Sequence, residues 1–184
     1  MKKIFLVLAA ALCVATVSAQ QKWSIGARVG SGFQADAEWF YSGDKYVEGR
    51  FGMGWLSGAL TADFTALHNW NCCNWDWTPS VGKWYLDAGA GVNVGGRPLY
   101  GVSYVYLGVA GQVKFGIKFN KVPIRLAVDV TPAFGPYFHL PYSEMVEVPN
   151  TSGGVDKVKV KYGGGAGFYA NGLLNLGLSA TYCF

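Results

Sequence analysis

The side chains of this chain that can take part in the widest range of reactions are its two histidines and its cysteines. His139 is followed closely by Ser143 and Glu144, and a base, a hydroxyl and an acid are the residue types of nucleophilic catalysis. Three such residues within one loop are common by chance, so their spacing alone predicts no triad. The strands expected around His68 and His139 place them at opposite ends of the fold. We therefore predict no catalytic residues and no enzymatic activity.

Cys72, Cys73 and Cys183 lie outside the N-terminal apolar segment that contains Cys13. An odd number of cysteines in an exported protein leaves at least one without a disulfide partner. Adjacent cysteines such as Cys72 and Cys73 rarely bridge to each other, because the peptide between them would be strained. Their spacing fits no zinc site, and no pair of histidines stands beside them. One disulfide bond and free thiols in a loop both remain open, and no metal or cofactor site is predicted.

Residues 1–19 have the organisation of a cleaved signal peptide. A basic pair precedes an apolar run from Ile4 to Val14, and residues 17–19 end in the small-residue pattern that signal peptidase accepts. The run is shorter than the roughly 20 residues that a membrane-spanning helix needs. Cys13 follows a leucine rather than a small residue, which disfavours lipidation. We expect an exported protein with a single domain over residues 20–184.

The composition excludes nucleic acid as a partner and favours β-structure. Without the two lysines of the leader, 13 of the 15 basic side chains remain against 11 acidic ones, and they are not clustered as a nucleic-acid interface requires. Charged residues make up 14% of the chain, against a usual share of about 25%. Aromatic residues make up 16%, and there are 26 glycines. Since no apolar stretch beyond the leader is long enough for a membrane helix, we expect β-strands with a surface that does not face only water.

Apolar and polar residues alternate with a period of two along most of the chain, which is the pattern of β-strands. Short glycine-containing polar segments at residues 30–32 and 42–45 separate the segments as hairpin turns do. Two longer connections are expected, a tryptophan-rich loop at 69–81 and the longest loop at 135–166. The pattern predicts eight antiparallel strands at 22–30, 33–41, 46–55, 58–68, 83–94, 103–119, 122–134 and 167–184.

One face of each predicted strand is apolar, and its aromatic residues gather near the strand ends. The near end is the end that carries both termini of an even-stranded up-and-down barrel. Aromatic rings at both borders of an aliphatic band are typical of membrane-spanning barrels, because amphipathic rings suit the membrane interfaces. The near-end set is Trp23, Trp39, Tyr41, Trp84, Phe119 and Phe184; the far-end set is Phe33, Trp55, Phe134 and Phe168; the band between includes Ile25, Ala27, Ala35, Phe51, Leu60, Leu86, Val109, Val113, Leu126, Val128 and Leu176.

The opposite face is polar and would line the interior of a closed sheet. Arg125 and Asp129 are four positions apart on one strand, about 13 Å between Cα atoms, so each must find its partner on another strand. An eight-stranded interior is about wide enough for side chains to fill, which favours a packed polar plug over an ion path. The expected interior set is Arg28, Asp36, Glu38, Glu48, Arg50, Asp63, Asp87, Lys114, Arg125 and Asp129, with Tyr85, Tyr104, Tyr106 and Gln112.

With the strands placed, several segments resemble the small eight-stranded outer-membrane barrels of the OmpA/OmpX type, most of all the versions common in Bacteroidetes. The resemblance covers nearly all of the chain beyond the leader and implies an eight-stranded antiparallel up-and-down transmembrane β-barrel in the cell outer membrane. The terminal aromatic residue Phe184 resembles the C-terminal signal that the barrel-assembly machinery recognises. The resemblance also implies that outer-membrane lipid surrounds the barrel. The segments are GARVGSG (26–32), YVEGRFG (46–52), WYLDAGAGVNVGG (84–96) and GVAGQVKFGIKFNKVPIRLAVDVTPAF (108–134).

The two predicted loops are the candidates for contacts outside the barrel. The loop at 69–81 lies at the near end, where its tryptophans suit aromatic packing at the lipid interface better than a partner-binding or redox site. Within 135–166, two alternating segments flank a turn-like stretch and predict a surface hairpin. Glu144 and Glu147 are expected to pair there with lysines among Lys157, Lys159 and Lys161. Two interpretations of this hairpin remain open. Its open edge could add a strand from a surface partner, or its lysines could prevent other chains from pairing with that edge.

These observations favour a non-enzymatic outer-membrane barrel that is structural or binds a surface partner through its extracellular loops. The first alternative is a narrow pore for small solutes. The second is a lipid hydrolase or acyltransferase that uses His139.

Overall fold

The structure is a computed structural model of the chain, and it describes all residues except 1–21, 31, 57–58, 98–103, 150–153 and 172–175. The predicted signal peptide falls outside the described residues. The described residues form twelve strands and no helix, which confirms the all-β prediction. The strands are β1 (Trp23–Val29), β2 (Gly32–Ser42), β3 (Lys45–Leu56), β4 (Ala59–Thr78), β5 (Gly82–Arg97), β6 (Tyr104–Phe119), β7 (Ile124–Val130), β8 (Ala133–His139), β9 (Tyr142–Pro149), β10 (Val155–Tyr162), β11 (Gly165–Asn171) and β12 (Leu176–Cys183).

Ten of these strands form one antiparallel sheet, and β9 with β10 forms a separate two-stranded sheet. β1 to β6 pair in chain order, β6 pairs with β7, β7 pairs with β12, and β12 pairs with β1. Each of these eight strands therefore has a hydrogen-bonded neighbour on both sides. β8 pairs with the first half of β6 on one side and with β11 on the other.

Twelve strands are described instead of the predicted eight, because the predicted strands at 122–134 and 167–184 each correspond to two described strands, and β9 and β10 lie within the predicted loop at 135–166. β7 and β8 keep one register against β6, so they are two halves of one strand path that is interrupted at Thr131 and Pro132. Pro132 has no N–H to donate to the ladder. The predicted last strand corresponds to β11 and β12, and the residues between them are not described. The alternation of apolar and polar residues does not reveal where a proline interrupts a strand.

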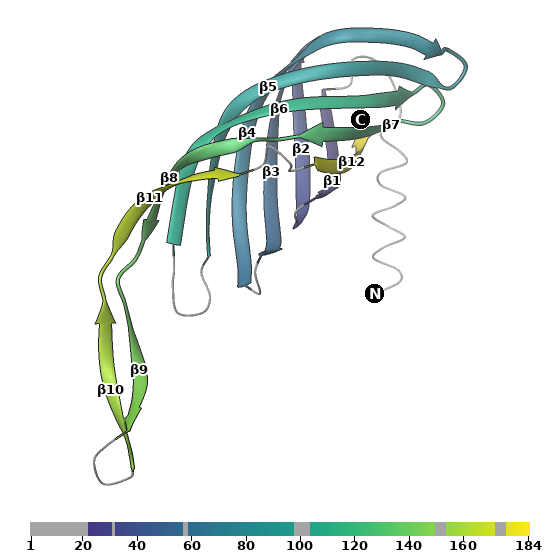
Figure 1. Cartoon of the computed structure of the whole chain (residues 1–184). Coiled ribbons are helices and arrows are strands. Elements are labelled where there is room, and N and C mark those ends of the chain that lie inside the picture. Colours follow the sequence, from purple (N-terminus) through teal and green to yellow (C-terminus); the bar gives the residue numbers. More distant parts are fainter. Residues whose placement is uncertain (1–21, 31, 57–58, 98–103, 150–153, 172–175) are drawn as a thin grey trace.

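The predicted loop at 69–81 is wrong over most of its length. β4 continues to Thr78 and pairs with β5 down to Gly82, with register shifts between Asn71 and Cys73 and between Trp75 and Thr78. Two-residue alternation fails at these irregularities, which is why the segment has the pattern of a loop although its backbone stays in the ladder. Figure 1 shows β4 and β5 extending together beyond their neighbours, at the end where the C-terminus lies.

The predicted long loop at 135–166 is also largely strand, and the hairpin within it is confirmed. β9 and β10 pair from Tyr142 with Tyr162 to Pro149 with Val155, and they project from the end of the sheet opposite to the β4–β5 extension (Figure 1). The side chains of Glu147 and Lys157 form the predicted ion pair, with Oε1 and Nζ 3.5 Å apart. Both groups are well exposed, so this pair contributes at most about 1 kcal/mol.

The inside of the paired strands is polar and the outside is apolar, which confirms the predicted assignment of faces. On β1, Arg28 is 1% exposed, whereas Ile25 on the other face is 55% exposed. Lys114 on β6 is 1% exposed, and its neighbour Val113 is 54% exposed. Of the ten predicted interior charges, all are buried except Asp63, which is partly buried. Among the described residues, no helix has the length and apolar character needed to cross a membrane.

Candidate functional site

The buried charged side chains other than Asp36 form one continuous chain of ion pairs, which we call the charged cluster. It links side chains of β1, β2, β3, β5, β6 and β7, and therefore joins strands that are far apart around the sheet. Its contacts are Arg28 to Asp129 (2.9 Å), Asp129 to Arg50 (3.3 Å), Arg50 to Glu48 (2.5 Å), Glu48 to Lys114 (2.8 Å), Lys114 to Glu38 (2.8 Å), Glu38 to Arg125 (2.8 Å) and Arg125 to Asp87 (3.0 Å).

The partners within the charged cluster come from different strands, as the strand geometry required. Arg125 pairs with Glu38 and Asp87, while Asp129 on the same strand pairs with Arg28 and Arg50. The prediction that Arg125 and Asp129 each find a partner elsewhere on the wall is confirmed. Which partner each one takes was not evident from the sequence, because it depends on which strands face each other across the interior.

Neutral polar side chains complete the hydrogen bonds of the charged cluster. Tyr46 donates its hydroxyl to Asp87 at 2.9 Å, and Asn69 donates to Glu48 at 2.7 Å. Thr131 joins Arg50 and Asp129 at 3.0 and 2.9 Å. Such partners offset part of the penalty that buried charges incur on losing water, and they link the charged cluster to further side chains of the interior.

Inner-face glycines make room for these large polar side chains. A Cβ atom on Gly177 would overlap the guanidinium of Arg28, and one on Gly89 would overlap the amide of Asn69. A Cβ atom on Gly116 would come within 2.6 Å of the Tyr85 hydroxyl oxygen, far inside van der Waals contact. Part of the high glycine content is thus explained by space for side chains that cross the interior.

Asp36 lies outside the ion-pair chain, but its carboxylate is close enough to those of Glu38 and Glu48 for the three to share a cation. Oxygens of Asp36, Glu38 and Glu48 are within 4.8 Å of one another, and all three residues are buried. The carboxylate oxygens of Asp36 are buried and have no hydrogen-bond partner. The Lys114 ammonium bonds Glu38 and Glu48 at 2.8 Å each, so two of the three carboxylates already share a cation.

Two cavities lie at opposite ends of the charged cluster. The near cavity has a volume of about 700 Å³ and reaches Arg125 and Asp87 at one end of the ion-pair chain. The far cavity has a volume of about 320 Å³ and reaches Arg28 and Arg50 at the other end. Among the residues that the structure describes, none lines both cavities. The charged cluster therefore separates them.

The far cavity is lined by tyrosines from several strands. Tyr106 and Tyr169 have ring centroids 5.0 Å apart, and Tyr104 and Tyr137 have centroids 6.3 Å apart. Tyr169 also donates its hydroxyl to Asn93 at 3.4 Å, at the wall of the same cavity. The predicted inward position of Tyr104 and Tyr106 is confirmed by their place in this lining.

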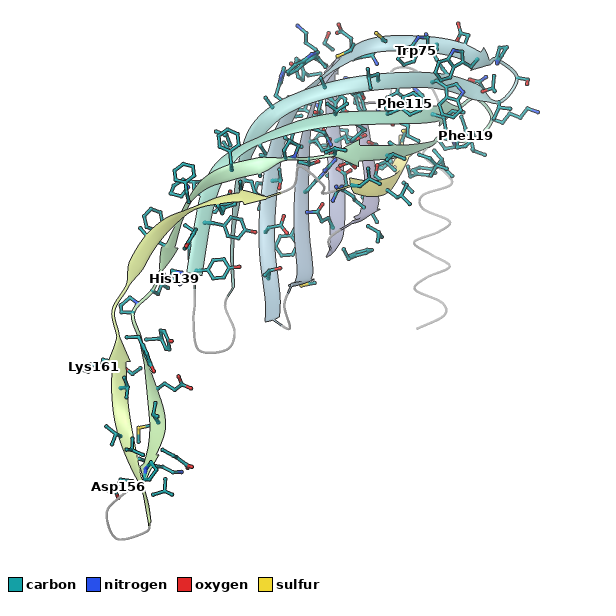
Figure 2. All side chains as sticks on the ribbon, in the orientation of Figure 1. Trp75, Phe115, Phe119, His139, Asp156 and Lys161 are labelled. Carbon is teal, nitrogen blue, oxygen red and sulfur yellow. The ribbon has the colours of Figure 1, made fainter. Side chains whose placement is uncertain are left out.

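The two histidines do not share a site, as predicted. His68 on β4 contacts Tyr41 and Trp70 at the outer face of the near end. His139 ends β8 beside Tyr104 and Tyr137, and Figure 2 shows it where the sheet narrows toward the hairpin. Among the described residues, no hydrogen bond joins His139 to Ser143 or Glu144.

All three described cysteines are free thiols, so the possible disulfide bond is absent. Cys72 and Cys73 are exposed on β4 rather than in a loop, and they lie at the first register shift against β5. Cys183 is buried on β12, where it pairs in register with Ser24 of β1. Its position on the inner face accounts for its burial.

Aromatic residues gather at both ends of the outer face. Trp23 and Trp39 are paired in register at the near end, with ring centroids 5.9 Å apart, and Phe33 and Phe168 are exposed at the far end. Of the other predicted members, Tyr41, Phe134 and Phe184 are exposed, Trp84 and Phe119 are partly exposed, and the side chain of Trp55 is not among those described.

An aromatic cluster across β4, β5 and β6 was missed from the sequence. Trp75, Trp77, Trp84 and Phe115 have neighbouring ring centroids 5.3 to 6.2 Å apart. Figure 2 shows Trp75 and Phe115 at the end opposite to the hairpin. The cluster forms because β4 continues past Asn69. The sequence predicted a loop there, so the cluster was not expected. It supports aromatic packing as the role of these tryptophans.

Comparison with models of protein families, with curated proteins and with solved structures found no match to this chain.

Proposed function

We propose that this chain is an integral outer-membrane protein whose strands close into an eight-stranded antiparallel up-and-down β-barrel, with β8 and β11 continuing the paths of β7 and β12. The observation that carries the proposal is the inverted polarity of the sheet. Arg28, Glu48 and Lys114 are almost fully buried, while Phe51 and Leu178 on the opposite face are 55% and 63% exposed. Soluble monomers rarely expose so continuous an apolar surface. In a bilayer these apolar side chains contact lipid instead of water, so their exposure carries no free-energy penalty.

The circuit of pairings supports the same proposal. Hydrocarbon offers no hydrogen-bond partners, so a membrane sheet must pair every strand on both sides. The circuit from β1 through β6, β7 and β12 back to β1 meets this requirement. β2 to β6 have 11 to 20 residues each, which is enough to cross a bilayer, since a tilted strand crosses it in about 9–11 residues.

The proposed orientation follows from the short connections and the leader. An exported chain with a terminal aromatic residue, Phe184, suits recognition by barrel-assembly machinery at the periplasmic side. The near end then faces the periplasm, and the β9–β10 hairpin faces the outside of the cell. We assign a structural or surface-binding role to this hairpin and its flanks at 135–166, and no enzymatic activity to the chain.

The proposal is tested by the migration of the membrane-fraction protein on a detergent gel. We expect the unheated protein to migrate at a different apparent mass from the boiled protein, because a closed barrel resists unfolding by the detergent. The protein should also require detergent for extraction from the outer membrane. A protein that is soluble without detergent and migrates identically with and without heating would overturn the proposal.

The charged cluster separates the two cavities, so we expect no steady conductance. In a planar bilayer, the wild-type protein should give no reproducible single-channel steps in salt solution, because the ion-paired side chains fill the middle of the interior. Steady steps of uniform size would favour the narrow pore for small solutes instead. A heat-modifiable sample from the same preparation serves as the control for folding.

A further inference from the structure

Three basic residues stand side by side across neighbouring strands at the near end. Lys83 of β5 is directly opposite Lys118 of β6, and Lys118 is directly opposite Arg125 of β7. All three line the near cavity, and Lys22 at the start of β1 lines it as well. Like charges at directly opposite positions destabilise a sheet, so this arrangement needs an explanation.

The lysines at the near cavity lack the carboxylate partners that neutralise the basic side chains of the charged cluster. Arg28, Arg50, Lys114 and Arg125 each have carboxylate partners within 3.3 Å. Lys22, Lys83 and Lys118, by contrast, have no carboxylate within 4.0 Å in the described part of the chain. The near cavity therefore contains three lysines whose charge is available to a ligand.

The acidic residues of the near cavity do not cancel this excess. Asp87 is already bonded to Arg125, Tyr46 and Asn71. Asp44, in the turn between β2 and β3, is exposed and accepts a hydrogen bond from Ser42 at 3.2 Å. In the described lining, Asp44 is thus the one acidic side chain without a cationic partner, and against three lysines it leaves the mouth of the cavity positive.

We propose that the near cavity binds a phosphate group, carried either by a soluble phosphate ester or by the headgroup of a membrane lipid. Lysine ammonium groups bind phosphate as point charges, and several can converge on one multivalent oxyanion. The rings of Phe40, Tyr46 and Tyr85 line the same cavity behind the lysines and offer an apolar wall to the organic part of the ligand. A volume of about 700 Å³ leaves room for both parts.

The experiment uses the full chain folded in a non-ionic detergent, titrated by calorimetry with pyrophosphate and, separately, with a short-chain phosphatidylglycerol. We expect saturable binding of at least one probe, and weaker binding at higher salt. The double variant Lys83→Gln, Lys118→Gln should weaken that binding by about tenfold or more, equivalent to about 1.4 kcal/mol. Binding of pyrophosphate alone would assign a soluble phosphate compound, binding of the lipid alone would assign a headgroup, and binding of both would support a site for the phosphate group itself.

The matched control is the double variant Lys159→Gln, Lys161→Gln, which removes the same charge from the β9–β10 hairpin. Its affinity should equal that of the wild type. No saturable binding of either probe by the folded wild type, or equal weakening in both double variants, would overturn the phosphate site. Heat-modifiable migration of each variant reports the barrel fold separately, so failure of the site and failure of the proposed barrel are distinguishable.

Discussion

Replacing Lys114 by methionine is expected to lower the free energy of unfolding by about 3–5 kcal/mol, because it leaves buried carboxylates without their shared cation. The Lys114 ammonium bonds Glu38 and Glu48 at 2.8 Å each, and the side chain is 1% exposed. Methionine fills a similar volume without the charge. The measurement is an equilibrium denaturant titration of the protein folded in lipid vesicles.

A double-mutant cycle with Glu48→Gln separates the ion pair from a general loss of packing. If the charge of Lys114 matters through Glu48, the double variant is more stable than the sum of the single effects predicts, by about 0.5–3 kcal/mol. Lys159→Met on the exposed hairpin is the control and should change stability by no more than about 0.5 kcal/mol. Equal small effects of Lys114→Met and Lys159→Met would contradict a packed charged interior.

The second large effect is expected on the outer face. Val113→Arg should make folding into a bilayer less favourable by about 2–4 kcal/mol, because it places a charge among lipid chains near the middle of the membrane. Val113 is 54% exposed, and its register partners are Ala88 on β5 and Val130 on β7, which offer no polar contact. In a water-soluble protein, the same exposed position would accept arginine with little change.

Val158→Arg supplies the control for this substitution. Val158 is also about half exposed, at 47%, but it lies on the β9–β10 hairpin that projects away from the main sheet (Figure 1). We expect its effect to stay within about 0.5 kcal/mol. Equal tolerance of arginine at both positions, measured as the yield and stability of protein folded into vesicles, would show that the outer face of β6 does not contact lipid.

The face of each side chain was predictable from the sequence because the period of a strand is two and the turns are short. Once Arg28 is assigned to the inside, Trp23, Ile25 and Val29 must point outward. The same reasoning placed Lys114 inward and Val113 outward. The hairpin over β9 and β10 was predictable for the same reason, since two alternating segments flank a turn.

The extent of the strands was less predictable where the ladder is irregular. Register shifts after Asn71 and Trp75 break the alternation although the backbone stays paired, so β4 was predicted to end ten residues early. Pro132 interrupts β7 and β8 without changing their register against β6. In both cases the hydrogen bonds to a neighbouring strand keep the segment in the sheet.

By itself, the sequence determined an all-β chain with one polar and one apolar face, because alternation is a local property of each strand. Only the tertiary structure decided which charges meet across the interior, and which are left without partners. Arg28 and Asp129 are 101 positions apart, and Lys83 meets Lys118 only through the register of β5 against β6. Such neighbours depend on how the strands are staggered around the sheet, which no single segment of the chain encodes.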